Sequence, residues 1–240
     1  MAYLLAFDTS TEAMSIALQS PQGLLVREAV GGAQASARLI PDILALLDEA
    51  SCTLAQLDAI AFGCGPGAFT GLRTACSVAQ GLAFGANKPV LAVDSLLLVA
   101  QDAHSQLPDA ASLDVWVAMD ARMDEIYAGA YRCQGGRWTV QSAPALYAVE
   151  ALNERWKAEP PTVVAGSALD AFGDRLNTRA AKRLPQTRSR AEALMQVAQQ
   201  LWTDGAAVDA AHALPVYLRD KVAQTTVERE AIRLAKEALS

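Results

Sequence analysis

The sequence predicts an α/β protein with two related domains, each built on a mixed sheet flanked by helices. Two observations carry this prediction. Apolar residues in the first part of the chain switch between strand and helix periodicity in the order β-β-β-α-β-α-β-α. Part of that order returns after residue 106. The 240 residues are 52% hydrophobic and 19% charged, so the chain has enough apolar material for full cores.

The first four predicted elements are three strands and a helix. Residues 3–7 form a short apolar run, residues 14–18 alternate, and residues 24–30 are β-prone after turn chemistry at 21–23. Residues 36–50 place leucines and isoleucines at helical spacing, with charged residues on the opposite side. The pattern predicts a three-stranded meander with a helix packed on it.

The next four elements alternate between strand and helix. Residues 58–63 are typical of a buried strand, a glycine- and proline-rich loop follows, and residues 72–86 form a helix. Residues 89–93 and 95–103 repeat the strand and the helix. This is the element order of the ribonuclease-H-like unit that actin, Hsp70 and the sugar kinases duplicate. We therefore predict two actin-like domains.

The second domain is predicted from an internal repeat. Strands at 115–119, 125–131 and 138–140 precede a helix at 149–156 and a strand at 162–165. Asp8 lies 15 residues before Gly23, and Asp120 lies 15 residues before Gly135. Residues 106–190 are thus interpreted as a smaller, degraded copy. Residues 1–105 form the first domain, and a helix at 191–203 returns to it, so that residues 191–240 belong with the first domain.

Composition and charge exclude several classes of protein. The longest uncharged runs are 14 residues each, whereas a membrane-spanning helix needs roughly 20. The N-terminus lacks a signal-peptide pattern. Four cysteines without a C-x-x-C pair and only two histidines disfavour a zinc cluster and suit a reducing compartment. A net charge of −6 is unlike that of a DNA-coating protein. We expect a cytoplasmic protein without membrane contact.

The glycine-rich loop at 63–71 is the strongest local motif. It lies between a strand and a helix, where glycines allow close backbone approach and free N–H groups can bind an anion. A Walker A lysine is missing, and the preceding strands do not fit a dinucleotide fold. Phosphate contact and a purely structural turn both remain open. The candidates for contact with a nucleotide or phosphate are Asp8, Thr9, Ser10, Gly65, Gly67, Thr70 and Arg73.

Small residues recur at every fourth position in the helix at 72–86. One row contains Gly71 and three alanines, and a second contains Ser77, Gly81 and Gly85. Such rows let another backbone come close, either the domain's own sheet or a helix of another subunit. The predicted interface, which includes apolar residues of the preceding helix, consists of Leu39, Ile40, Ile43, Leu47, Gly71, Ala75, Ala79 and Ala83.

Two charged groups of the sequence have open roles. Asp8 and Asp120 end equivalent strands, where they could bind Mg²⁺ together or simply cap turns. A dense segment around the second of them contains Asp120, Arg122, Glu125 and Tyr127, to which we assign no role. Six cations between residues 175 and 190, ending at Arg190, favour a solvated face over an RNA contact. The sequence contains no H-E-x-x-H, H-x-x-x-H or G-x-S-x-G motif, so it predicts neither a histidine metal site nor a catalytic triad.

Four segments resemble the TsaB (YeaZ) family over residues 1–220. They are Leu4-Leu5-Ala6-Phe7-Asp8-Thr9-Ser10, Gly65-Pro66-Gly67-Ala68-Phe69-Thr70-Gly71-Leu72-Arg73, Met119-Asp120-Ala121-Arg122 and Pro215-Val216-Tyr217-Leu218-Arg219. This family belongs to the bacterial system that makes threonylcarbamoyladenosine in tRNA, and its two actin-like domains agree with the duplication.

The resemblance implies a noncatalytic subunit that binds and activates the threonylcarbamoyl transferase TsaD. Ser95 and Val99 stand where TsaD has its metal-binding histidines. The implied contacts are a heterodimer with TsaD through the helices at 36–50 and 72–86, a homodimer through the same face, the ATPase TsaE, and tRNA indirectly. The resemblance implies no cofactor of its own, although a nucleotide at the junction with TsaD is open, and no protease activity. The alternative is an autonomous actin-like ATPase or kinase using Asp8, Asp120 and the glycine loop.

Overall fold

A five-stranded mixed sheet with the order β3-β2-β1-β4-β5 forms the base of the first lobe in the computed structural model, which describes residues 2–219. The central strand β1 (Leu4–Asp8) pairs antiparallel with β2 (Ala13–Ser20) and parallel with β4 (Ala59–Gly65). The outer strands are β3 (Gly23–Val30) and β5 (Val90–Asp94). β1 is buried along its whole length, as a central strand covered on both faces requires.

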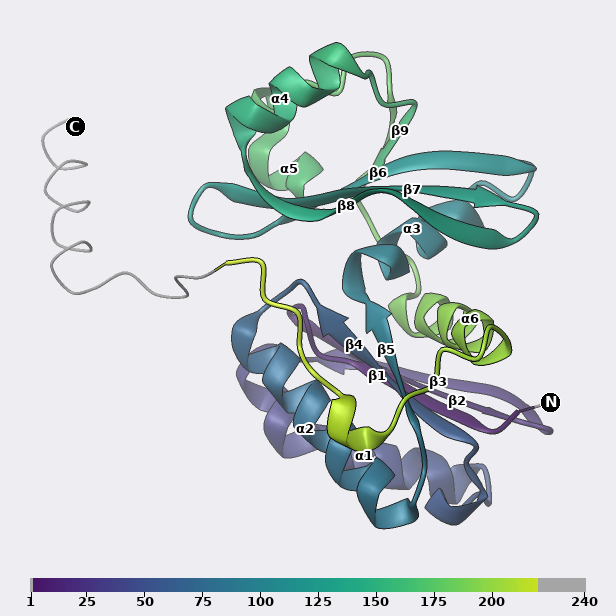
Figure 1. The fold of residues 1–240 in the computed structure, drawn as a ribbon. Helices are drawn as coiled ribbons and strands as arrows, with labels where there is room; N and C mark the ends of the chain where they lie inside the picture. The colour runs from purple at the N-terminus through teal and green to yellow at the C-terminus, as the bar shows by residue number, and fades with distance from the viewer. Residues whose placement is uncertain (1, 220–240) are drawn as a thin grey trace, which may run out of the picture.

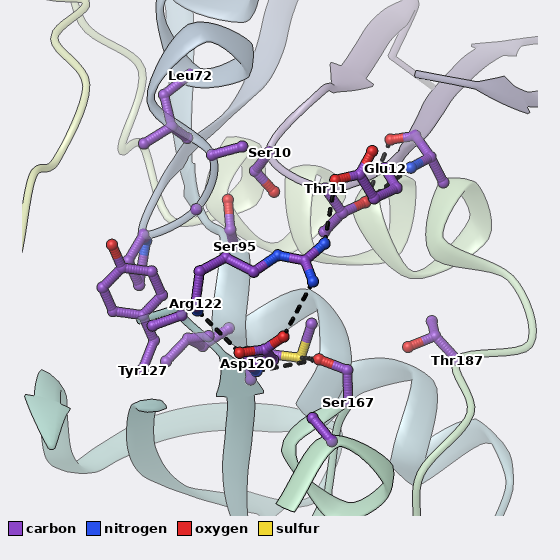
Figure 2. A pocket seen from close by; sticks show the side chains of 18 of the residues that line it. Ser10, Thr11, Glu12, Leu72, Ser95, Asp120, Arg122, Tyr127, Ser167 and Thr187 are labelled. Atoms are coloured by element: carbon purple, nitrogen blue, oxygen red, sulfur yellow. Dashed lines mark hydrogen bonds and ion pairs between the residues drawn. The ribbon is translucent and has the colours of Figure 1, made fainter. Parts of the chain in front are cut away.

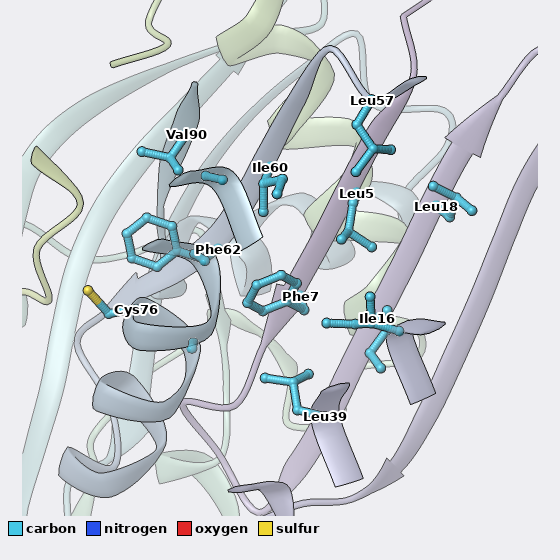
Figure 3. Close-up of a cluster of buried hydrophobic side chains, with 14 of the residues drawn as sticks. Leu5, Phe7, Ile16, Leu18, Leu39, Leu57, Ile60, Phe62, Cys76 and Val90 are labelled. Carbon is cyan, nitrogen blue, oxygen red and sulfur yellow. The ribbon is translucent and has the colours of Figure 1, made fainter. Parts of the chain in front are cut away.

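Helices cover both faces of this sheet (Figure 1). On one face, α1 (Ala35–Glu49) and α2 (Phe69–Ala86) enclose a core that includes Phe7, Ile16 and Phe62 (Figure 3). On the other face, α6 (Arg190–Thr203) packs Leu194 and its neighbours against the small side chains of β1 and β4. The helix predicted at 191–203 is therefore present, and it lies on the first sheet.

The second lobe repeats the topology of the first. Its sheet order is β10-β9-β6-β7-β8. Read from β8 to β10, this order corresponds strand by strand to β3-β2-β1-β4-β5 of the first sheet. Its strands and helices are β6 (Ser112–Asp120), β7 (Glu125–Gln134), β8 (Arg137–Ala148), α4 (Val149–Ala158), β9 (Val163–Ala165), α5 (Ala168–Phe172) and β10 (Lys182–Leu184). The two parallel strands of this copy have three residues each, so the predicted reduced second copy is confirmed.

Several boundaries differ from the predicted ones. β8 extends over 12 residues instead of 138–140, because shifts in its register with β7 near Ala130 interrupt the alternation of apolar residues. α5 and β10 were not predicted, since both are too short for a periodic pattern. α2 begins at Phe69, three residues before the predicted start. Short 3-10 helices occupy Gly32–Gln34, Leu54–Gln56, Gly173–Arg175 and Ala210–His212.

Helix α3 (Ser95–Ser105) is shared by the two lobes and lies between the two sheets in Figure 1. Leu98 belongs to the core under α6, whereas Leu96 and Val99 pack with the inner strands of the second sheet. The buried carboxylate of Asp102 accepts hydrogen bonds from two backbone N–H groups at 188 and 189, where the chain returns to the first lobe. α3 thus contacts both lobes and the chain segment that connects them.

The last described residues form a returning segment, residues 208–219, which runs along α2. It begins as a bridge between Val208 and Val90. The carbonyl of Ala213 accepts hydrogen bonds from the Cys76 thiol and the Gln80 amide of α2. The C-terminal part of the predicted first domain, residues 220–240, lies outside the described residues. Among the residues described, no helix is long and apolar enough to span a membrane.

Candidate functional site

A cleft of about 1010 Å³ lies between the two lobes, with the start of α3 among the residues that line it. Figure 2 shows polar side chains that line it. They come from the loop after β1, from the end of β6 and the turn after it, from the start of α3, from β7, and from the loops after β9 and β10. Its walls consist of residues 10–13, Glu28, 66–69, Leu72, Ser95, Leu96, 119–123, Tyr127, Ser167, Asp170, Ala171, 185–187, Arg190 and 216–219.

A buried ion pair underlies this cleft. The Asp8 carboxylate, which is fully buried, lies 2.6 Å from Nη2 of Arg190 and accepts a hydrogen bond from its Nε at 2.8 Å. The backbone N–H and the hydroxyl of Ser10 donate to the same carboxylate. The guanidinium also donates to the carbonyl of Ser95. All of these groups come from the chain itself, so Asp8 is already neutralised without a cation.

The glycine loop packs against the chain's own backbone. A Cβ atom added at Gly71 would lie 1.8 Å from the carbonyl oxygen of Thr9, and one at Gly67 would lie 2.6 Å from that of Ser10. At Gly65 the same construction meets the carbonyl of Val216 at 2.6 Å. The Thr9 hydroxyl donates to the Gly71 carbonyl at 2.6 Å. Of the two interpretations left open, the structural turn accounts for these glycines.

The last two candidates for phosphate contact lie in the first turn of α2. Thr70 is exposed, and its carbonyl accepts a hydrogen bond from the Thr74 hydroxyl. The guanidinium of Arg73 stacks on the Phe69 ring, 3.9 Å from its centroid, and donates to the Tyr217 hydroxyl at 3.1 Å. Arg73 therefore binds the returning segment to α2 and is not poised as a free phosphate ligand.

The segment after β6 forms a left-handed turn at the mouth of the cleft. Three successive residues, Arg122 to Asp124, have φ between 56° and 62°. Asp120 accepts a hydrogen bond from the Arg122 backbone at 2.8 Å and pairs with its guanidinium. The same guanidinium reaches Glu12 of the first lobe at 3.3 Å. Tyr127 lines the cleft, where burial raises the pKa of its phenol.

Of the two roles left open for Asp8 and Asp120, a shared Mg²⁺ site and separate turn caps, their contacts fit the turn caps. Asp8 is buried beneath the cleft with Arg190, while Asp120 caps its own turn on the opposite wall with Arg122. Within the part of the chain that the structure describes, no group of three or more histidine, cysteine or acidic side chains is placed to hold a metal ion. The alternative of an autonomous ATPase relies on Asp8 and Asp120, and both carboxylates are paired with arginines of the chain.

Ser95 and Val99 have structural roles. The Ser95 hydroxyl accepts a hydrogen bond from the Gly65 backbone at 3.1 Å, and Val99 packs in the core shared with the second lobe. Nearby, burial raises the pKa of Asp94, although its carboxylate accepts a hydrogen bond of 2.6 Å from the Tyr131 hydroxyl. Burial, together with the charge of Asp94, raises the pKa of the Cys64 thiol to about 12.

Most of the side chains predicted to form the interface with another subunit are buried in the chain's own core. Only Ile40 of the eight predicted residues is exposed; the other seven face the first sheet or pack beneath α1 and α2, namely Leu39, Ile43, Leu47, Gly71, Ala75, Ala79 and Ala83. Their row of small residues lets α2 approach its own sheet closely. The second row, Ser77, Gly81 and Gly85, is the exposed one. Whether these helices bind another subunit stays a prediction.

The predicted solvated face of cations is wrong at Arg190, which is 6% exposed and pairs with Asp8. Arg175 makes two hydrogen bonds to Asp124, and Arg183 donates to the carbonyl of Leu169. Sequence reasoning missed the role of Arg190 because its partner lies 182 positions away. No local pattern marks such a pair, although the Ser189 cap at the start of α6 indicates where the helix begins.

Two lobes with the same sheet topology around one cleft define a protein of the predicted two-lobed actin-like fold, in which Asp8 at the end of β1 pairs with the chain's own Arg190. Comparisons with known proteins specify it further. The family model of TsaD, tRNA N6-adenosine threonylcarbamoyltransferase, matches residues 29–227. The tRNA threonylcarbamoyladenosine biosynthesis protein TsaB of Escherichia coli is 33% identical over 225 residues, which are 92% of this chain and 96% of that protein.

Further relatives agree with this match. The TsaB protein of Haemophilus influenzae is 44% identical over 124 residues, about half of each chain. The solved structure of YeaZ from Pseudomonas aeruginosa superposes with a TM-score of 0.80 at 41% identity, over 91% of this chain and 100% of that one. The chain belongs to the TsaB family, also called YeaZ.

Proposed function

We propose that this chain is a noncatalytic subunit in the synthesis of N6-threonylcarbamoyladenosine at adenosine 37 of tRNA, and that it binds and activates TsaD in the cytoplasm. The observation that carries the proposal is the Asp8–Arg190 ion pair, which fills with the chain's own groups the position where an actin-like enzyme needs a free carboxylate. The names of the relatives supply the pathway. A protein whose Asp8 carboxylate is already paired with Arg190, and whose family belongs to this pathway, is best explained as a partner of the enzyme.

The proposed contact surface is the outer side of α1 and α2. It carries three exposed apolar side chains, of which Phe84 is 85% exposed, Leu44 50% and Ile40 42%. Beside Phe84, a Cβ atom added at Gly81 or Gly85 would meet nothing within 4 Å. Exposed apolar side chains next to open glycines suit a second pair of helices that packs closely.

The occupant of this surface is TsaD in the active complex and a second copy of the chain when TsaD is absent. TsaE and tRNA join through TsaD, and any nucleotide belongs to the junction of the two subunits and not to the cleft of this chain. Phosphate groups fit the cleft poorly, since Arg190 and Arg122 are each paired with a carboxylate.

The test compares variants of the surface in a reconstituted reaction containing TsaD, TsaE and tRNA. Gly81→Arg and Phe84→Asp are expected to prevent co-purification with TsaD and to reduce tRNA modification to the level without this chain. Glu154→Arg on α4 is the matched control, because it introduces the same side chain as Gly81→Arg at an exposed position of the second lobe. Ala79→Arg is unsuitable, since Ala79 is fully buried and the variant would unfold.

Normal binding and modification by both surface variants would refute the contact surface. Modification that proceeds fully without the chain would refute the subunit role itself. Calorimetric titration of the isolated chain with Mg-ATP addresses the alternative function, and micromolar binding would favour an ATPase.

A further inference from the structure

The returning segment ends on the second lobe, at the mouth of the cleft. Nη2 of Arg219 donates to the Arg122 carbonyl at 3.1 Å and pairs with the Glu125 carboxylate at 2.5 Å. Its Nη1 contacts the Met123 sulfur at 3.6 Å. One side chain thus contacts two residues of the left-handed turn, Arg122 and Met123, and also Glu125 at the start of β7. The backbone conformation of this turn is uncommon for residues other than glycine.

The same segment is anchored to the first lobe immediately before Arg219. The Val216 N–H donates to the carbonyl of Cys64 in β4 at 2.7 Å. The Tyr217 ring packs against Phe69, with centroids 5.1 Å apart, and its hydroxyl accepts from Arg73. Both anchors lie on the strand–loop–helix unit that leads into α2, so the position of Arg219 is fixed relative to that helix.

A second arginine contact crosses the cleft mouth, but it is weaker. Arg122 and Glu12 meet at 3.3 Å, with side chains 71% and 81% exposed. Exposed pairs of this kind typically contribute little, because water and salt screen them. Arg219 and Glu125 are 12% and 36% exposed, so their contact is much less screened. Of the two contacts, that of Arg219 is the one able to hold the lobes.

We propose that Arg219 is a positioning residue that fixes the second lobe relative to α2 and so sets the width of the cleft. Inside the cleft the lobes share α3, which begins among the lining residues and packs in the cores of both lobes. With the lobes joined there, the less exposed of the two contacts across the mouth, that of Arg219, sets the remaining angle. This inference goes beyond the proposed function and does not depend on it, because it concerns the isolated chain.

The test measures the distance between the lobes by pulsed electron paramagnetic resonance on the full chain. Spin labels at Ala45→Cys on α1 and Ala151→Cys on α4 report on the two lobes, and both positions are exposed. The four native cysteines are buried, and burial raises the pKa of each thiol, so they stay unlabelled. Circular dichroism confirms that each variant is folded.

Arg219→Ala is expected to broaden the distance distribution and move it to longer distances. Glu125→Gln, which removes the charge from the other side, is expected to do the same. The charge exchange Arg219→Glu with Glu125→Arg is expected to restore a narrow distribution. Arg175→Ala is the control, because it removes a two-hydrogen-bond pair with Asp124 of the same turn entirely within the second lobe.

Distributions of Arg219→Ala and Glu125→Gln that match the wild type would overturn the proposal. Equal broadening in Arg175→Ala would also overturn it, since any loosening of the turn would then suffice. If Arg219→Ala does not fold, Glu125→Gln and the charge exchange still decide the question.

Discussion

Arg190 compensates the negative charge of the Asp8 carboxylate, which is buried in the first lobe. It is 6% exposed, and its partner Asp8 is fully buried, so neither charge is solvated without the other. Removing one member of such a pair leaves an uncompensated charge in the core, which is far more costly than removing both. Arg190 therefore serves as the internal counter-ion of the Asp8 carboxylate.

Arg190→Met is expected to lower the free energy of unfolding by about 3–5 kcal/mol, because the Asp8 carboxylate is left unpaired. The measurement is urea denaturation followed by circular dichroism. Asp8→Asn combined with Arg190→Met should lose clearly less than the sum of the two single variants. An additive result would mean that the two side chains do not stabilise each other.

Asp94 predicts a dependence of stability on pH. Its pKa in the folded chain is raised from 3.8, mainly by burial, so the folded state binds a proton more tightly than the unfolded state. The contribution of Asp94 to the free energy of unfolding is therefore greatest at low pH. It falls as the pH rises from 3.8 through the pKa of Asp94 in the folded chain.

Asp94→Asn is expected to remove this fall, since an amide does not ionise while its oxygen can still accept from the Leu96 N–H. The measurement is the unfolding free energy of both proteins across the acidic range. Relative to the wild type, the variant should gain stability as the pH rises. A constant difference between the two proteins would contradict the prediction.

At the scale of the element, α2 contains glycines with opposite roles. Gly71 faces Thr9 so closely that a methyl group has no room, whereas Gly81 faces open space. Gly71→Ala should cost at least about 3 kcal/mol, the upper range for overpacking. Gly81→Ala should stabilise by about 1 kcal/mol through helix propensity. Thermal melting of the two variants in parallel measures both, and a shift in the same direction would contradict the assignment of the two faces.

Helix α2 also shows which features of the structure can be predicted from the sequence. The spacing of its small residues correctly predicted two rows, but spacing alone does not say which row faces the sheet, because both faces of α2 carry small residues. The strands of the first lobe were predicted well, since buried strands are continuous in apolar residues. Arg190 and Arg219 were beyond prediction, because their partners lie 182 and 94 positions away.

At the scale of the whole molecule, α3 makes the two lobes one folding unit. Its residues contribute to the core beneath α6 and to the core of the second sheet. The internal repeat thus gives two similar sheets whose cores both include residues of α3. Loss of packing on α3 should be felt in both lobes at once.

Leu96→Ala is expected to lower the unfolding free energy by about 2–5 kcal/mol, since Leu96 is 1% exposed in the shared core. Tryptophan fluorescence reports mainly on the second lobe, where Trp116, Trp138 and Trp156 lie, while helical circular dichroism reports on both lobes. The midpoints from the two probes should coincide and move together. Two separate transitions would show that the lobes unfold independently.

β3 has a consequence for the protein in concentrated solution. It is the last strand on its side of the first sheet, and Leu24, Val26 and Val30 on it are exposed. An edge of this length offers unpaired backbone groups to any extended chain, including one from a partly folded copy. Two charged residues on β3, Arg27 and Glu28, disfavour such pairing, and Arg27 is itself paired with Glu49 of α1. Handling at low ionic strength, where that pair is screened least, would therefore favour a monodisperse preparation.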